Sequence, residues 1–541
     1  MSQFSLLPPE LLDTVVSQLP NSDIKSLRLT SSFFHSRVRL RLDRVFISAN
    51  PRNIEVLRAV ADHEVLRKGV TEVIWDDASL MKTLEPSHPD LYVDYSDLDP
   101  GSEWDSSGSE PDSDSNSDQG SAKKFCPGWF KFARQGNIEL NYHGCPDVDH
   151  PVHVLRQKQV DNSMRLHDSW SHYQTLLKQQ DAVLTSNADS DALVYALLRF
   201  PSLRRITITP AAHGFIFMPL YETPMIRDFP YGFNYPIPRG WPAVNGIDDG
   251  AHPEANSWHE GQFATEHEKN RWRGFRIITQ VLAREEHRIS EVVIDVHGLS
   301  TGLNCRIFDK PSEEYDNFVT ILKRPGFRRL DLSLLVGAQQ HYNWVSYRSG
   351  YLRQALGSAE ELEHISLHSD VDENVATDSA LSDNDIFVPL RTIFPIDKWP
   401  RLQHFGLSRF MVNQDDLISI LSALPPTLRS VELSFLKFED GGDYNGLICG
   451  MRNTLNWRQR AINERPKLSM GIDHYESLPG RAAWVEKNVE AFVYGDGINP
   501  FEGNEISSPW SLSQGKWFTR DEFDPVGEQY CDNEFGEDGT G

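Results

Sequence analysis

The sequence predicts an α/β protein in which a short helical unit precedes a long series of alternating helices and strands. Two patterns carry this prediction. Apolar residues recur at helical spacing within the first fifty residues. After them, a short apolar strand pattern returns six times between residues 203 and 433, usually following a helical stretch and a Pro or Gly. Hydrophobic residues make up 39% of the 541 residues, so the chain can bury a core in more than one folded unit.

Three short helices are expected in the first 46 residues. Pro9 suits the first turn of a helix, where a missing N–H costs nothing, and Pro20 ends that helix. Its apolar residues recur at spacings of one, three and four: Leu11, Leu12, Val15, Val16 and Leu19. The second helix carries Ile24 and Leu27, and Ser31 can cap a third that carries Phe34, Val38 and Leu42. A unit of about forty residues is weakly stable alone, so we expect part of its apolar surface to meet a partner.

The order of residues in this unit resembles the F-box family. The matching segments are Leu7-Pro8-Pro9-Glu10-Leu11-Leu12, Leu19-Pro20, Asp23-Ile24, Leu27-Arg28-Leu29 and Phe33-Phe34, within residues 4–46. The sequence departs at Thr30, where the family often has valine, and at Phe33 and Phe34, where it often has tryptophan. The segments Arg44-Val45-Phe46-Ile47-Ser48 and Trp75-Asp76-Asp77 resemble fungal F-box proteins in particular. The alternative is an ordinary three-helix cap without a partner.

The resemblance implies a function. F-box proteins bind a Skp-type adaptor, which joins them to a cullin scaffold that carries ubiquitin-conjugating machinery, and the rest of the chain captures a protein substrate. It implies a non-catalytic adaptor without cofactors, with residues 1–48 as the F-box. The adaptor-binding residues implied are Leu7, Pro8, Leu11, Leu12, Val15, Val16, Ile24, Leu27, Leu29 and Phe34. Two alternatives are an F-box scaffold acting outside a ligase and a repeat-domain enzyme whose site no motif reveals.

The strand pattern has the form Leu-x-x-Leu-x-Leu, the core of a leucine-rich repeat. It occurs at Leu203–Ile208, Ile289–Ile294, Phe327–Leu332, Leu362–Leu367, Leu402–Leu407 and Leu428–Leu433. From Phe327 onward the repeats are 35, 40 and 26 residues apart, and the asparagine that closes a regular repeat is absent. We therefore expect an irregular leucine-rich-repeat-like solenoid, with its first helix–strand units in residues 49–95 and its recognition domain in residues 123–505. The alternative is a mixed α/β domain with chance repetition.

Acidic segments interrupt and end this array. No basic residue lies between Lys82 and Lys123, and Ser, Asp and Gly dominate there, so residues 96–122 are expected to be a disordered loop. Ser107, Ser109 and Ser115 each precede an acid by three residues, which suits an acidophilic kinase, although a solvated linker explains the segment as well. Residues 506–541 form an acidic tail.

An insertion at residues 211–244 is dense in aromatic residues and prolines. The prolines exclude a long helix, and so many aromatic side chains would not remain in water, so the segment is expected to pack as an ordered loop. It either plugs the repeat domain or forms a recognition surface, since Tyr and Trp anchor partners well. Tyr221, Phe233 and Trp241 are the substrate-binding residues predicted on the second alternative.

The net charge, the cysteines and the absence of catalytic motifs each bear on the class of function. With 53 basic and 78 acidic residues, the net charge of −25 disfavours nucleic acid and anionic membranes as partners. Five scattered cysteines indicate a reducing compartment, and the N-terminus lacks a signal-peptide pattern, so a cytoplasmic or nuclear protein is expected. No phosphate loop, dinucleotide fingerprint, nucleophile elbow or zinc-protease motif occurs.

Two clusters of reactive residues were considered as sites. Cys126, His143, Cys145, His150 and His153 lie within 28 residues but lack the Cys-x-x-Cys spacing of structural zinc sites, so no metal is predicted. Asp76 and Asp77 follow a predicted strand, where neighbouring side chains point to opposite faces, which disfavours a catalytic pair.

Overall fold

The computed structural model describes residues 8–19, 21–82, 126–144, 151–243, 253–262, 264–337, 339–371, 387–439, 441–473, 481–502, 517–522 and 529–531. Ten strands of this part form one parallel sheet in the order β1-β2-β3-β4-β6-β7-β8-β10-β12, with β5 paired to β6. These strands are β1 (Arg44–Ile47), β2 (Glu72–Asp76), β3 (Arg205–Thr209), β4 (Glu291–Ile294), β5 (Leu303–Asn304), β6 (Arg329–Leu335), β7 (His364–Ser369), β8 (His404–Ser408), β10 (Ser430–Ser434) and β12 (Lys467–Ser469).

After three helices that precede the first strand, the longer helices fall between the strands, as an alternating array requires. They are α1 (Pro9–Ser17), α2 (Asn21–Thr30), α3 (Ser32–Arg37), α4 (Pro51–Asp62), α5 (Gly128–Gly144), α6 (Pro151–Asp161), α7 (Leu166–Ser186), α8 (Ala188–Arg199), α11 (Arg273–Arg284), α12 (Glu313–Leu322), α14 (Tyr351–Gly357), α17 (Gln414–Ala423), α18 (Tyr444–Thr454) and α19 (Glu486–Tyr494). Single-turn helices are α9 (Pro224–Arg227), α10 (Glu266–Lys269), α13 (Val345–Arg348) and α16 (Leu390–Ile393). The 3₁₀ helices are η2 (Leu66–Lys68), η5 (Asn270–Trp272), η6 (Cys305–Phe308), η7 (Gln339–Tyr342), η9 (Ile396–Lys398), η10 (Trp457–Gln459) and η11 (Ile462–Glu464).

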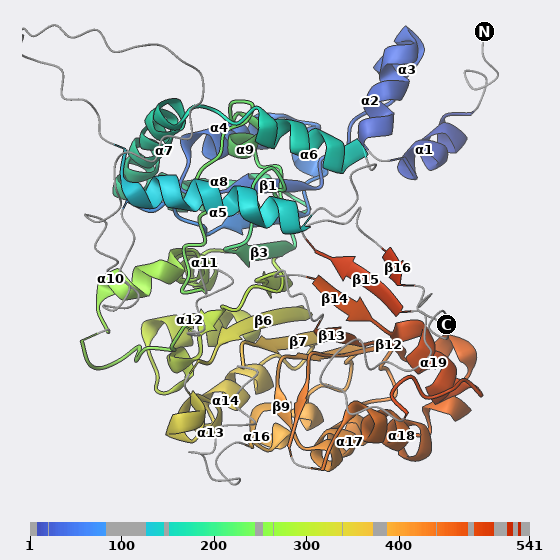
Figure 1. The fold of residues 1–541 in the computed structure, drawn as a ribbon. Helices are drawn as coiled ribbons and strands as arrows, with labels where there is room; N and C mark the ends of the chain where they lie inside the picture. The colour runs from blue at the N-terminus through green and yellow to red at the C-terminus, as the bar shows by residue number, and fades with distance from the viewer. Residues whose placement is uncertain are drawn as a thin grey trace, which may run out of the picture.

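Both layers of the main domain advance in chain order. Apart from the short β5, each strand of the sheet pairs in parallel with the strand that follows it along the chain. Helices α4, α8, α11, α12, α14, α16, α17, α18 and α19 contact one another in the same succession. Figure 1 shows helices α11 to α18 following the sheet along one side. The predicted α/β class, with a parallel sheet and many helices, is thus confirmed.

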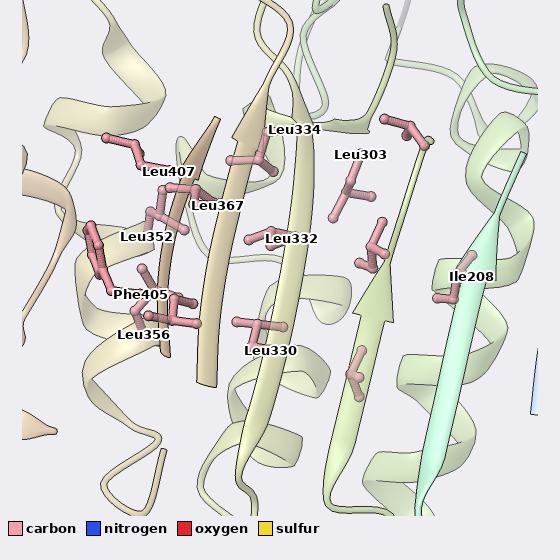
Figure 2. Packing of buried hydrophobic residues seen from close by; sticks show 14 of the residues in the cluster. Ile208, Leu303, Leu330, Leu332, Leu334, Leu352, Leu356, Leu367, Phe405 and Leu407 are labelled. Atoms are coloured by element: carbon pink, nitrogen blue, oxygen red, sulfur yellow. The ribbon is translucent and has the colours of Figure 1, made fainter. Parts of the chain in front are cut away.

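The core lies between the sheet and these helices. The six predicted strand segments form β3, β4, β6, β7, β8 and β10, and their apolar positions align across the sheet. One aligned row is Val45, Val73, Ile206, Val292, Leu330, Ile365, Phe405, Val431 and Leu468, all buried. Figure 2 shows Leu352 and Leu356 of α14 beside Leu367 and Phe405, in the same core as Leu330 and Leu332. Because strand side chains alternate, the intervening positions lie on the opposite face of the sheet.

Smaller elements flank the main domain. β13 (Gly471–Asp473), β14 (Arg481–Trp484), β15 (Trp517–Asp521) and β16 (Gln529–Cys531) form an antiparallel sheet, and β9 (Met411–Val412) pairs with β11 (Lys437–Phe438). A second core joins α5 and α7 to the 211–243 segment, whose only helix within the described residues is α9. No helix in the described ranges is long and apolar enough to cross a membrane.

Candidate partner-binding surfaces

The three N-terminal helices have a small core of their own. It contains Leu12, Val16, Ile24, Phe34 and Val38, with Leu19, Leu27, Phe33 and Leu40 packed against it. The side chain of Ser31 accepts a hydrogen bond from the N–H of Phe34 and caps α3 as predicted. The third helix is shorter than the sequence suggested, because Val38 has extended backbone, yet this residue still enters the core.

The residues implied to bind an adaptor divide into two groups. Leu12, Val16, Ile24 and Phe34 are buried in the small core, and Leu27 is partly buried. Pro8, Leu11, Val15 and Leu29 are exposed, and Leu7 lies outside the described residues. This division gives the two groups different roles: the buried ones hold the helices together, and the exposed ones are free to contact a partner.

Helix α1 presents two apolar stripes side by side. Leu12 and Val16 are one helical turn apart and face the core, whereas Leu11 and Val15, also one turn apart, leave 53% and 39% of their surfaces exposed. A monomeric helix this short gains nothing from a second apolar stripe in water. The exposed stripe of Leu11 and Val15 is therefore the candidate docking surface of this unit.

The second candidate surface is the face of the main sheet that points away from the helices. Its first row of side chains aligns in register across the strands: Arg44, Glu72, Arg205, Glu291, Arg329, His364, His404, Ser430 and Lys467. We refer to this side as the polar face. Each of these residues is the first of its strand, and none has a hydrocarbon side chain. The row is therefore suited to polar contacts rather than to packing in a second hydrophobic core.

A depression of about 580 Å³ lies on the polar face where strands β3 to β10 begin. It is lined by Arg204, Arg205, Glu291, Arg328, Arg329, Glu363, His364, Gln403, His404, Arg429 and Ser430. With neutral histidines these residues carry a net charge of +3, on a chain whose total is −25. We refer to this feature as the arginine depression.

Two stacked histidines form part of its wall. The rings of His364 and His404 lie parallel with their centroids 4.0 Å apart. His364 Nε2 is 2.8 Å from a carboxylate oxygen of Asp331, and His404 Nδ1 is 2.8 Å from the hydroxyl of Ser430. Burial, together with the neighbouring His364, lowers the pKa of His404 to about 3, so His404 is neutral at physiological pH. Gly406 makes room here, because a Cβ at that position would approach the Ser366 hydroxyl to 2.6 Å.

Further along the strands the polar face carries carboxylates, next to apolar side chains such as Ile74 and Val293. Asp331 belongs to β6 and Glu432 to β10, and Asp295 follows β4. Glu522, next to β15, approaches His297 Nδ1 at 3.6 Å, which brings the C-terminal sheet to this face. Burial, with Asp331, Glu522 and Asp295 nearby, raises the pKa of Glu432 to about 7. The polar face therefore has a positive end at the strand starts and a negative end beyond it.

The raised pKa of Glu432 predicts a dependence of stability on pH. Because the folded chain holds this proton more tightly than the unfolded chain, stability falls as pH rises from about 4.5 through about 7. Replacing Glu432 with glutamine should remove this loss. The variant should be more stable than the native chain at pH 8, by on the order of 3 kcal/mol, and no more stable at pH 4.5. Urea unfolding at the two pH values measures the difference, and a variant less stable at pH 8 would contradict the assignment.

The predicted substrate-binding residues of the insertion separate in the structure. Phe233 and Trp241 are 2% exposed and lie in the interior, which favours the alternative that the insertion plugs the domain; their role in recognition stays a prediction. Tyr221 is half-buried and lies against Phe46 of β1, with its hydroxyl 3.4 Å from His297 Nε2. Of the three, Tyr221 alone reaches the polar face, and its role in recognition stays a prediction.

The Trp75-Asp76-Asp77 segment is the centre of a buried polar cluster that sequence reasoning did not foresee. Asp77 accepts hydrogen bonds from the indole N–H groups of Trp75 and Trp241, at 3.1 and 2.7 Å, and from the N–H of Gly274 at 2.8 Å. Burial raises the pKa of Asp77 to about 6, although these three bonds oppose the rise. Asp77 thus ties β2, the insertion and α11 together.

The neighbouring Asp76 faces a different set of groups. Its Oδ2 atom is 3.7 Å from His213 Nε2, and His213 Nδ1 is 2.8 Å from the hydroxyl of Tyr235. Burial raises the pKa of Asp76 to about 8 and lowers that of His213 to about 3. All three side chains are buried, so this chain of groups has no access for a substrate and serves the interior of the fold.

Other residues considered in the sequence lie outside the part of the chain that the structure describes. Ser107, Ser109 and Ser115 lie outside the described residues, as do Cys145 and His150. Within the described ranges no three His, Cys, Asp or Glu side chains gather to hold a metal ion. No protein-family model matches the chain, and no curated protein matches it significantly.

Proposed function

We propose that the chain is the substrate-recognition subunit of a Skp-cullin-F-box type ubiquitin ligase. The observation that carries the proposal is the exposed Leu11–Val15 stripe on a helix whose sequence, Leu7-Pro8-Pro9-Glu10-Leu11-Leu12, resembles the opening of the F-box. The other face of the same helix packs into a core with α2 and α3. A unit that is folded and still presents apolar side chains to water is suited to bind a partner such as the Skp-type adaptor.

We also propose that the main domain is an irregular leucine-rich-repeat-like solenoid that captures the substrate. The succession of parallel strands and helices in chain order supports it, as does the repeated apolar row across the sheet. Such arrays present one broad surface formed by successive strands. The polar face is that surface, and it is assigned to substrate capture.

In this function the chain performs no bond chemistry. It holds a captured protein beside the ubiquitin-conjugating machinery that the cullin carries, and so raises the effective concentration of the acceptor lysine near the ubiquitin donor. The F-box scaffold that acts outside a ligase would share the adaptor contact but would not cause turnover of a bound partner.

Reconstitution with purified components tests the proposal. The full chain, a Skp-type adaptor and a cullin are expected to co-elute as one complex in size-exclusion chromatography, and a chain lacking residues 1–48 is expected to elute apart. Partners captured by the chain in cells should accumulate when the cullin is inactivated. Co-elution without any change in partner abundance would favour the scaffold, and failure to bind the adaptor would refute both.

A further inference from the structure

The arginine depression is a positively charged feature on an acidic chain. Five of its eleven lining residues are arginines, drawn from the starts of β3, β6 and β10. Guanidinium groups bind carboxylates and phosphates through paired N–H donors, so a cluster of them favours an anionic ligand.

Three of the arginines already have acidic partners. Arg204 and Arg205 share Glu291, at 3.5 and 2.5 Å, and Arg329 pairs with Asp331 at 2.5 Å. Arg328 and Arg429 are exposed, and neither has a carboxylate of the described residues within ion-pair distance. The guanidinium of Arg429 donates to the carbonyl oxygens of Pro426 and Leu428. These two guanidinium groups, with the carboxylate of Glu363 at the start of β7 between them, are therefore the charges that a ligand would meet.

The sheet fixes the spacing between them. Arg328 precedes β6 and Arg429 precedes β10, and β7 and β8 lie between those strands. Neighbouring strands are about 4.8 Å apart, so the two positions are separated by about 14 Å. An extended peptide rises about 3.4 Å per residue, so two side chains four residues apart span the same distance.

The acidic end of the polar face limits the kind of anion. Asp295 and Glu522 lie beyond the depression with exposed carboxylates, and a long polyanion such as RNA would extend over them and be repelled. A short peptide whose acidic groups lie only within the depression, with neutral or basic residues elsewhere, avoids that repulsion. The charge pattern thus favours a protein segment over a nucleic acid.

We propose that the arginine depression binds an extended acidic peptide segment that crosses strands β6 to β10, with two anionic side chains four residues apart on Arg328 and Arg429. The proposal rests on the proposed function, since the peptide would belong to the captured protein. The anionic groups are carboxylates of Asp or Glu, or phosphates on Ser, because both match the guanidinium group in the same way.

The test uses the full chain and fluorescein-labelled nine-residue Gly/Ser peptides in fluorescence anisotropy. One peptide carries Glu at positions 3 and 7, one carries phosphoserine there, one carries Glu at positions 3 and 5, and one carries no charge. The variant Arg328→Glu with Arg429→Glu removes the two available charges. Its matched control, Arg284→Glu with Arg458→Glu, reverses two partly exposed arginines outside the depression.

We expect the native chain and the control to bind a 3,7 peptide, with at least tenfold loss in the Arg328/Arg429 variant and weaker binding as salt rises. If only the phosphoserine peptide binds, the site requires phosphate groups. If both 3,7 peptides bind, either carboxylates or phosphates suffice. No binding of either 3,7 peptide, or equal binding by the Arg328/Arg429 variant, overturns the proposal. Tighter binding of a twelve-residue polyuridine RNA, lost in the same variant, overturns the peptide as the ligand.

Peptide binding and adaptor binding can be tested independently of each other. The Arg328/Arg429 variant should still bind the adaptor, because its substitutions lie on the main sheet. A variant with Asp at Leu11 and Val15 should still bind the peptide. Failure of peptide binding with an intact adaptor complex would refute the depression as a binding site and leave the docking surface of α1 standing.

Discussion

Replacing Leu11 and Val15 with aspartate is expected to abolish binding of the Skp-type adaptor while the chain remains folded. Both side chains are exposed on one face of α1 and take no part in the small core. Burying each one against a partner contributes roughly 1.5–3 kcal/mol, and a buried, unpaired carboxylate adds a further cost. The combined loss is at least a hundredfold in affinity, which isothermal titration with purified adaptor would measure.

The chain offers a closely matched control. Val152 and Leu155 are also one helical turn apart, on α6, and are 40% and 61% exposed. Aspartates at these two positions should leave adaptor affinity unchanged. Ile24→Asp, by contrast, should unfold the three helices, because Ile24 is completely buried. Undiminished binding by the Leu11/Val15 variant would show that the stripe is not the docking surface.

The second large effect is expected on stability, from a substitution of the buried residue Asp77. Asp77→Ala is expected to destabilise the chain by about 3–5 kcal/mol, because the indole N–H groups of Trp75 and Trp241 and the N–H of Gly274 would lose their buried acceptor. The space is tight as well: a Cβ at Gly274 would lie 2.5 Å from the Trp75 ring. The midpoint of urea unfolding measures the change.

Asp77→Asn is the matched control for this prediction. It keeps the shape of the side chain and one acceptor oxygen, so we expect a smaller loss than for alanine. Tyr231→Ala, on an exposed aromatic residue of the same insertion, should change stability by less than about 0.5 kcal/mol. An alanine variant within 1 kcal/mol of the native chain would show that Asp77 does not join the insertion to the sheet.

Much of the fold could be predicted because the strand segments repeat the same pattern of apolar residues. The positions held by Ile206, Leu330 and Ile365 recur at fixed offsets, and each faces the helices in the structure. Helix ends were less predictable: α3 ends at Arg37, although the spacing of Phe34, Val38 and Leu42 predicted a longer helix. Local propensity does not decide where a chain leaves a helix to reach the next strand.

The sites were predicted less well, for two physical reasons. The insertion is dense in aromatic residues, but its composition does not decide whether Trp241 contacts a partner protein or the interior. In the structure Trp241 donates a hydrogen bond to Asp77, and a contact between residues 164 positions apart cannot be read from local sequence. The arginine depression had a signal that could have been found. Arg204-Arg205 and Arg328-Arg329 occupy the same two places of their repeats, and parallel register brings such places together.

Hydrogen–deuterium exchange of the native chain, with and without the Skp-type adaptor, tests the central claim most directly. The account predicts that the adaptor slows exchange within residues 8–38, around Leu11 and Val15, and leaves strands β3 to β10 unchanged. Unchanged exchange in residues 8–38 at saturating adaptor, or protection confined to the main sheet, would contradict it.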